Sequence, residues 1–195
     1  MNIGIDLDDV TVGFIDYFLS HFNKKTGKNK VKKDIFSYNL ANSLSVNPEF
    51  LDELFDEIFG SDMHLDLKPM DKAVESIQEL SKNHKITLIT ARPIKFKEKT
   101  EKWLKQNSLN NFELIFSTNP YIGIKAKKKA DICIEKGISI MLEDNADYSL
   151  DCANLGINVV LFNRPWNQNI AHQKITCVNN WDEAIKIINL LSQNN

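Results

Sequence analysis

The chain has 195 residues, of which 43% are hydrophobic and 26% are charged, and these values indicate a globular protein rather than a disordered one. Its formal net charge of −2 excludes a general basic field for a nucleic acid polymer or an anionic membrane. No apolar run approaches the roughly 20 residues that cross a bilayer. Acids stand at the N-terminus where a signal peptide needs bases, so we expect a cytoplasmic protein.

The first third of the sequence predicts one strand followed by helices. Residues 2–7 form an apolar run that is typical of a buried strand. Apolar residues recur at helical spacing over residues 11–24, and again from Pro48 to a stop at Gly60. No convincing strand interrupts residues 11–68. This pattern favours a helical insertion after the first strand.

From Pro69 onward the sequence alternates between helices and short apolar strands. Predicted helices at 71–83, 95–106, 127–136 and 147–155 lead into strands that include KITLIT, FELIFS, ISIMLED and INVVLF, and a last helix covers 181–191. Such alternation predicts a parallel sheet with helices on both faces. The expected fold class is α/β, a three-layer Rossmann-like parallel sheet core with a small helical cap. We assign residues 1–12 and 69–195 to the core and 13–68 to the cap.

Polar residues follow three of the predicted strands. The first strand ends in Asp6-Leu7-Asp8-Asp9-Val10, the strand ITLI is followed by Thr90-Ala91-Arg92, and ISIML ends in Glu143-Asp144. In an open parallel sheet, ligands bind beyond the carboxyl ends of the strands. GxGxxG and GxxxxGK[ST] loops are absent from the sequence. Carboxylates that gather at one sheet edge suit a divalent cation, and hard oxygen ligands favour Mg²⁺.

These segments together resemble the haloacid dehalogenase-like superfamily of phosphatases, which carries DxDx[TV] after its first strand. Thr90 matches the second motif of that superfamily and the pair Glu143-Asp144 matches the fourth. The third motif is a lysine at the start of a helix, for which Lys129 fits best within KAKKKAD, while Lys125 and Lys128 stay open. All four motifs occur in order over most of the chain.

Within the superfamily, the chain looks most like the 5′(3′)-deoxyribonucleotidase group. The helical insertion lies where that group has its small cap, and Phe14 matches an aromatic residue that contacts the nucleobase. The segment ITARPIKFK is similar to a segment of the group, which implies phosphate binding at Thr90 and Ala91 and substrate binding at Lys95. FNRPWN resembles bacterial members.

The resemblance implies a two-step phosphoryl transfer. Asp6 is the expected nucleophile that forms an aspartyl-phosphate, and Asp8 is the expected general acid and base. The acid role requires a proton on Asp8 near neutral pH, which neighbouring carboxylates favour. Lys129 and the Thr90 hydroxyl are expected to hold the phosphate oxygens.

The same resemblance assigns the metal ligands. Mg²⁺ is expected on Asp6, on the carbonyl of Asp8 and on Asp144, with Glu143 or Asp147 in support. The expected substrate is a small phosphate ester, a (deoxy)nucleoside monophosphate first, with another ester such as a sugar phosphate as the alternative. A catalytically silent regulatory domain is a further alternative. Such a domain would be expected to lack Asp6 or Asp8, and both are present.

The sequence leaves the roles of several residues to be interpreted. Asp9 is interpreted as a cap of the following helix, and Arg92 as a ligand of phosphate or of a surface acid. Phe14 is either part of the cap core or a platform for a base, and Trp166 is either a lid or packing. The Phe-rich faces of the insertion either pack internally or form a homodimer.

Overall fold

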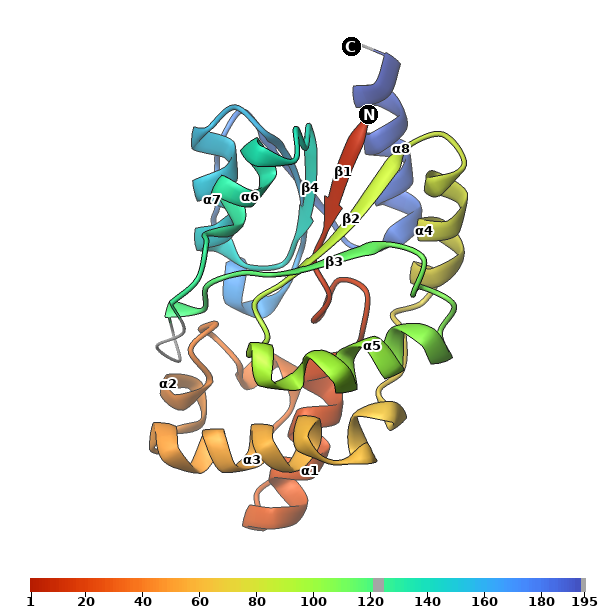
Figure 1. Ribbon diagram of the computed structural model, residues 1–195. Helices are drawn as coiled ribbons and strands as arrows, with labels where there is room; N and C mark the ends of the chain where they lie inside the picture. Colours follow the sequence, from red (N-terminus) through yellow and green to blue (C-terminus); the bar gives the residue numbers. More distant parts are fainter. Residues whose placement is uncertain (121–124, 194–195) are drawn as a thin grey trace.

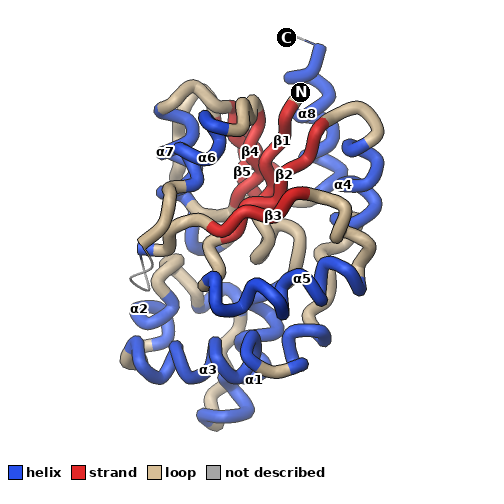
Figure 2. The backbone as a smooth tube through the Cα atoms, in the orientation of Figure 1, coloured by secondary structure: helices blue, strands red, loops and turns tan. Residues whose placement is uncertain are grey.

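The computed structural model describes residues 1–120 and 125–193. In this part of the chain a single sheet contains six strands in the order β3-β2-β1-β4-β5-β6, and each neighbouring pair is parallel (Figures 1 and 2). This arrangement confirms the predicted α/β class. Within the described residues, no helix combines the length and apolar character that crossing a bilayer requires.

The strands follow the apolar runs of the sequence, with one addition. They are β1 (Asn2–Ile5), β2 (Lys85–Thr90), β3 (Glu113–Phe116), β4 (Ile140–Glu143), β5 (Asn158–Phe162) and β6 (Ile175–Val178). The sequence analysis did not predict β6, a short edge strand whose two central residues are exposed and whose apolar signal is therefore weak. At Gly4, a Cβ atom would lie 2.8 Å from the Met141 sulfur, so only glycine fits there without a shift of that side chain.

Helices cover both faces of the sheet and make it a three-layer core. In Figure 1, α4 (Ala73–Ser81) and α8 (Trp181–Gln193) lie on one side, and α6 (Lys129–Glu135) and α7 (Ala146–Asn154) lie on the other. Helix α5 (Lys97–Gln106), preceded by η3 (Ile94–Phe96), lies between the sheet and the inserted helices. Each helix buries one apolar stripe, as their sequence periodicity predicts.

The segment between β1 and β2 contains the predicted helical insertion. It comprises α1 (Phe14–Thr26), η1 (Lys32–Asp34), α2 (Leu40–Leu44), α3 (Pro48–Gly60) and η2 (Asp62–Asp66). The five-residue α2, which Asn39 caps through the Ala41 N–H, was not predicted because it is too short to show periodicity. The phenylalanine side chains of α1 and α3 pack on one another within the chain, namely Phe14, Phe18, Phe22, Phe50, Phe55 and Phe59.

Two segments of chain run side by side where the insertion meets the sheet. The Gly13 N–H donates to the Lys68 carbonyl at 2.9 Å, and the Met70 N–H donates to the Thr11 carbonyl at 2.9 Å. These bonds lie at the boundaries that the sequence predicts for the cap, 12/13 and 68/69. They place the ends of the insertion beside the acidic loop that follows β1. The division of the chain into core and cap stays a prediction.

Candidate active site

The acidic loop after β1 is held by its own backbone. The Asp6 N–H donates to the Leu142 carbonyl at 3.0 Å and so extends the pairing of β1 with β4. The Thr11 hydroxyl donates to the Asp6 carbonyl at 2.7 Å, and the N–H groups of Thr11 and Val12 both donate to the Leu7 carbonyl. The loop therefore turns back on itself within a few residues, with the Asp6 side chain buried beneath it.

Asp9 has a structural role in this loop. Its φ of +57° is a left-handed conformation that few non-glycine residues other than Asn and Asp adopt readily. Its Oδ2 accepts a hydrogen bond from the Ile15 N–H at 3.0 Å, in the first turn of α1, which confirms the interpretation of Asp9 as a helix cap. The buried Arg164 donates to the Asp9 carbonyl from Nη2 at 2.7 Å and from Nε at 3.2 Å.

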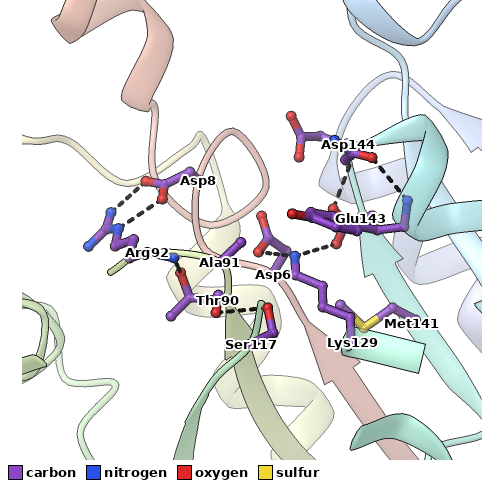
Figure 3. A network of polar contacts seen from close by, with 12 residues as sticks. Asp6, Asp8, Thr90, Ala91, Arg92, Ser117, Lys129, Met141, Glu143 and Asp144 are labelled. Carbon is purple, nitrogen blue, oxygen red and sulfur yellow. Dashed lines mark hydrogen bonds and ion pairs between the residues drawn. The ribbon is translucent and has the colours of Figure 1, made fainter. Parts of the chain in front are cut away.

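Lys129 is the lysine that reaches the acidic cluster. It begins α6, and its Nζ donates to Oδ1 of Asp6 at 2.6 Å and to Oε2 of Glu143 at 2.9 Å. Lys125 and Lys128 are exposed, and the Nζ of Lys128 lies 3.5 Å from a carboxylate oxygen of Asp151. Of the three lysines left open by the sequence, Lys129 is therefore the one placed at the strand ends (Figure 3).

Burial controls the electrostatics of this cluster. It raises the pKa of Asp6, and it raises the pKa of Glu143 to about 8, although the Lys129 ammonium opposes both shifts. Burial also raises the pKa of Asp144 well above its ordinary value, with the Glu143 carboxylate adding to the effect. For Lys129, burial lowers the pKa, but the carboxylates of Asp6 and Glu143 outweigh it and the net shift is upward. The ammonium group of Lys129 thus interacts with two buried acids, Asp6 and Glu143.

Three of these acids could hold a cation. Asp6, Glu143 and Asp144 each offer a carboxylate oxygen, and the three oxygens lie within 4.8 Å of one another. Oδ1 of Asp144 is buried and has no hydrogen-bond partner among the described residues, whereas Oδ2 accepts from Trp166 Nε1 at 2.9 Å. An unsatisfied buried carboxylate oxygen beside two more acids fits a hard divalent cation such as Mg²⁺. Asp147 is exposed and lies outside this cluster.

The end of β2 supplies the second side of the site. Thr90 is fully buried, and its Oγ1 accepts a hydrogen bond from the Arg92 N–H at 3.2 Å. The Ser117 hydroxyl donates to the Thr90 carbonyl at 3.1 Å, and the Asn119 side chain donates to the Ala91 carbonyl at 3.0 Å. The backbone at Thr90 and Ala91 is therefore fixed next to the acidic loop, as Figure 3 shows.

Asp8 points away from Lys129 and toward Arg92. Arg92 donates from Nε to Oδ2 of Asp8 at 2.8 Å and from Nη2 to Oδ1 at 2.5 Å (Figure 3). The partner of Arg92 is therefore Asp8, the predicted general acid. From the sequence, a phosphate or a surface acid was the expected partner of Arg92. The two aspartates of DxDx[TV] thus lie in different electrostatic surroundings.

A cavity of about 340 Å³ opens above these loops and reaches into the inserted helices. Asp6, Asp8, Ala91, Arg92 and Asp144 line it from the sheet side, and the cap side includes Phe14, Tyr38, Asn39, Leu51, Phe55 and Phe59. Its volume lies in the range of small-molecule sites. With a cation held by the acidic cluster, the charged end would suit an anionic group of a ligand, and the aromatic end suits an apolar or planar part.

Two predicted substrate residues differ in their placement. Phe14 is 8% exposed, lines the cavity and stacks on the Phe59 ring with centroids 5.3 Å apart, so it belongs to both the cap core and the cavity wall. Lys95 is exposed, and its Nζ pairs with Oδ1 of Asp56 at 2.5 Å. It is not among the residues that line the cavity, and its contact with substrate stays a prediction.

The segment FNRPWN supports the site more than the sequence analysis anticipated. Asn167 donates to the carbonyls of Asp144 at 2.6 Å and Phe162 at 2.8 Å, Arg164 holds the Asp9 carbonyl, and Trp166 binds Asp144 and lines the cavity. Trp166 therefore contacts a candidate metal ligand and is more than packing. The sequence signals for this segment were its position after a core strand and its resemblance to bacterial members of the group.

A family model and a bacterial relative match nearly the whole chain. A family model described as "5′ nucleotidase, deoxy (Pyrimidine), cytosolic type C protein" matches residues 1–194. A Bacillus cereus protein named "Putative nucleotidase" is 27% identical over 193 residues, which cover 96% of this chain and 98% of that protein.

Two solved structures share the fold. The haloacid dehalogenase-like family protein SP0104 of Streptococcus pneumoniae has a TM-score of 0.68 at 15% identity, with 96% of this chain and 97% of that chain covered. A haloacid dehalogenase family hydrolase of Deinococcus radiodurans with bound phosphate and sodium has a TM-score of 0.64 at 14% identity, with 96% and 94% covered.

Proposed function

Because the chain belongs to the deoxy (pyrimidine) cytosolic type C 5′-nucleotidase family, within the haloacid dehalogenase-like superfamily, we propose that it hydrolyses (deoxy)nucleoside monophosphates through an aspartyl-phosphate on Asp6, with Mg²⁺ as cofactor. The family makes the protein a hydrolase of phosphoric monoesters of the 5′-nucleotidase type. The proposal adds the substrate class, the metal and the residues that act.

One observation carries the proposal. Asp6 lies at the floor of a cavity, next to two further buried carboxylates and in contact with the buried Lys129 ammonium. Burying this many charges costs free energy that packing does not recover, so a purely structural cluster is unfavourable. A site that binds a cation and a phosphate gives each of these charges a partner.

Asp6 is suited to the nucleophilic role. In the first step, one oxygen of its carboxylate forms a bond to phosphorus while the bond from phosphorus to the leaving oxygen breaks. Asp8 gives a proton to that leaving oxygen, and in the second step it takes a proton from the water that attacks the aspartyl-phosphate. Lys129 Nζ already contacts Asp6, and it would also balance the charge of the phosphate oxygens.

The metal ligands follow from the same cluster. Asp6 and Asp144 would hold Mg²⁺ through carboxylate oxygens, together with the Asp8 carbonyl, and Glu143 would support them through its contact with Lys129. The bound cation would neutralise phosphate charge and keep these acids ionised. Trp166 and Asn167 orient Asp144 through its Oδ2 and its carbonyl.

Phosphate binding is assigned to the end of β2. The hydroxyl of Thr90 and the backbone N–H of Ala91 would donate to the phosphate oxygens together with Lys129, and Ser117 and Asn119 fix that segment through its carbonyls. The aromatic wall formed by Phe14, Phe55 and Phe59 supports the choice of a nucleotide, because a planar base can stack on such rings.

The first experiment tests the chemistry. Asp6→Asn keeps the shape of the side chain but removes the nucleophile, and we expect it to abolish turnover of a generic aryl phosphate in the presence of Mg²⁺. Circular dichroism and the thermal unfolding midpoint report whether the variant is folded. Wild-type-like activity of a folded Asp6→Asn protein would contradict the mechanism, and full activity after exhaustive chelation would contradict the metal assignment.

The second experiment tests the substrate. Phosphate release is measured on a panel of ribonucleoside and deoxyribonucleoside monophosphates and sugar phosphates at equal concentration. We expect the highest kcat/KM on a nucleotide. Equal or higher values on sugar phosphates would overturn the nucleotide assignment while leaving the phosphatase mechanism in place.

A further inference from the structure

Arg92 is buried in the wall between the sheet and the inserted helices, with its side chain 2% exposed. Its Nε and Nη2 donate to the two oxygens of Asp8, and its Nη1 lies 3.4 Å from the Thr100 hydroxyl in α5. The face of the guanidinium covers the Phe59 ring of α3, with 4.5 Å from Cζ to the ring centroid. Three separate elements therefore hold this one side chain.

The geometry restricts Asp8 in turn. A guanidinium that donates two parallel hydrogen bonds to a carboxylate fixes the plane of that carboxylate as well as its position. Asp8 keeps 22% of its side chain exposed, and it lines the cavity. Its carboxylate is thus anchored from behind by Arg92 and open on the side where a substrate binds.

From this arrangement we propose that Arg92 is the positioning residue of the general acid Asp8. The inference rests on the proposed function, in which Asp8 gives its proton to the leaving oxygen as the bond from phosphorus to that oxygen breaks and the bond from Asp6 to phosphorus forms. Arg92 donates to both oxygens of Asp8, a geometry that fits the carboxylate produced by that transfer. Arg92 thereby stabilises Asp8 after proton donation and holds it ready to take a proton from water.

Direct phosphate binding by Arg92 is the competing role. Nε and Nη2 are engaged by Asp8, Nη1 approaches Thr100, and the guanidinium face lies on Phe59. A phosphate would therefore have to displace Asp8 to accept hydrogen bonds from Nε and Nη2 together. The two roles predict different kinetics, because phosphate binding serves every ester equally, whereas proton donation serves only esters whose leaving group needs the proton.

The test compares two aryl phosphates of similar shape, phenyl phosphate, with a basic leaving group, and 4-nitrophenyl phosphate, with a leaving group that departs without a proton. The value of kcat/KM is measured for wild type and Arg92→Lys, because it reports the steps up to the first irreversible one. General acid catalysis contributes about 10²- to 10⁴-fold, so we expect Arg92→Lys to lose at least about 30-fold on phenyl phosphate. On 4-nitrophenyl phosphate we expect a loss under about 3-fold.

Two further variants support the interpretation. In an Asp8→Asn background, Arg92→Lys should cause no additional loss on phenyl phosphate, because the residue through which it acts is already disabled. Thr100→Val removes one anchor of the guanidinium without burying a new charge, and it should show the same selective loss at smaller size. This variant keeps the test usable if Arg92→Lys does not fold. Lys99→Gln, in the same helix with an exposed ion pair to Asp62, is the matched control.

The outcomes distinguish positioning of Asp8 from direct phosphate binding by Arg92. Equal losses on both esters, or a full additional loss in the Asp8→Asn background, would overturn the positioning role and favour phosphate binding or general structure. A selective loss on phenyl phosphate that disappears in the Asp8→Asn background would support it. Absence of turnover of both esters by the wild-type protein with Mg²⁺ would contradict the proposed function itself, and the inference with it.

Discussion

Lys129 donates a 2.6 Å hydrogen bond from Nζ to Oδ1 of Asp6, and both side chains are almost fully buried. The two residues are 123 positions apart in the sequence, and they meet because β1 ends and α6 begins at the same edge of the sheet. Lys129 also binds Glu143, so one ammonium group connects the predicted nucleophile with a predicted metal-supporting acid.

Removal of this ammonium group is expected to affect both activity and stability. Lys129→Gln leaves Asp6 and Glu143 without their positive partner, and breaking a buried ion pair typically costs about 3–5 kcal/mol of unfolding free energy. We expect kcat/KM on an aryl phosphate to fall by at least about 100-fold, by analogy with loss of a preorganised electrostatic donor. Chemical denaturation and steady-state kinetics measure the two effects.

Lys128→Gln is the matched control for this prediction, since Lys128 is the preceding residue, is exposed and pairs with Asp151. It should change neither quantity beyond a small surface effect. Comparable losses in both variants would show that the charge of the whole lysine run matters rather than the contact with Asp6.

Binding of Mg²⁺ is expected to release protons. Burial raises the pKa of Glu143 to about 8 in the metal-free protein, so this group is largely protonated at neutral pH. A cation favours the ionised form, and the affinity for Mg²⁺ should therefore rise with pH between 6 and 8. Titration calorimetry in buffers with different ionisation enthalpies measures the protons released. An affinity that is independent of pH between 6 and 8 would contradict this assignment, and Glu143→Gln should reduce the dependence without removing it, because the pKa values of Asp6 and Asp144 are raised as well.

Asp9 predicts a change of stability with pH. Burial raises its pKa from 3.8 to about 6 despite the opposing charge of Lys32. Protonated Asp9 therefore stabilises the folded state. This contribution is fully present below pH 3.8 and is lost as the pH rises through about 6. Asn accepts the positive φ and the hydrogen bond from Ile15, but it does not titrate.

Asp9→Asn should therefore gain stability relative to wild type as the pH rises from about 4 to 7, by up to about 3 kcal/mol. Denaturant unfolding of both proteins with a chelator present, at several pH values, measures this difference. Asp16→Asn, which also removes an oxygen near Lys32 Nζ, controls for the lost contact. A difference that stays constant over this pH range would show that the Asp9 carboxylate is not destabilised by burial.

Phe14 should affect nucleotides more than smaller esters. Phe14→Leu removes a ring from the cavity wall, and base stacking on an aromatic ring is worth about 1–3 kcal/mol. We expect KM for a nucleoside monophosphate to rise about 5- to 150-fold, in line with that energy, while ribose 5-phosphate changes little. Phe22→Leu in the same helix is the matched control, since Phe22 is buried in the cap and does not line the cavity. A rise of KM that is equal for both substrates would assign Phe14 to the cap core alone.

Local sequence patterns were sufficient for the parts of this protein that depend on neighbouring residues. Asp6 and Asp8 follow an apolar strand, and Glu143-Asp144 follow another, so their meeting at one sheet edge could be predicted from the alternation of strands and helices. The weak cases were short or exposed elements. The edge strand β6 and the five-residue α2 present too few periodic positions for hydrophobic patterning to detect them.

Contacts between distant segments needed the folded chain. Lys125, Lys128 and Lys129 are equivalent as letters, and the exact start of α6 decides which ammonium group is buried against Asp6. Arg92 and Asp8 are 84 positions apart, and their pairing depends on how two loops face each other across the cavity. Hydrophobic periodicity reports which face of an element is buried, but the direction of a polar side chain depends on charges and hydrogen-bond partners that other elements supply. The acids of the first loop and their expected roles are therefore readable in the sequence, whereas their partners, Lys129 for Asp6 and Arg92 for Asp8, were decided by the tertiary structure.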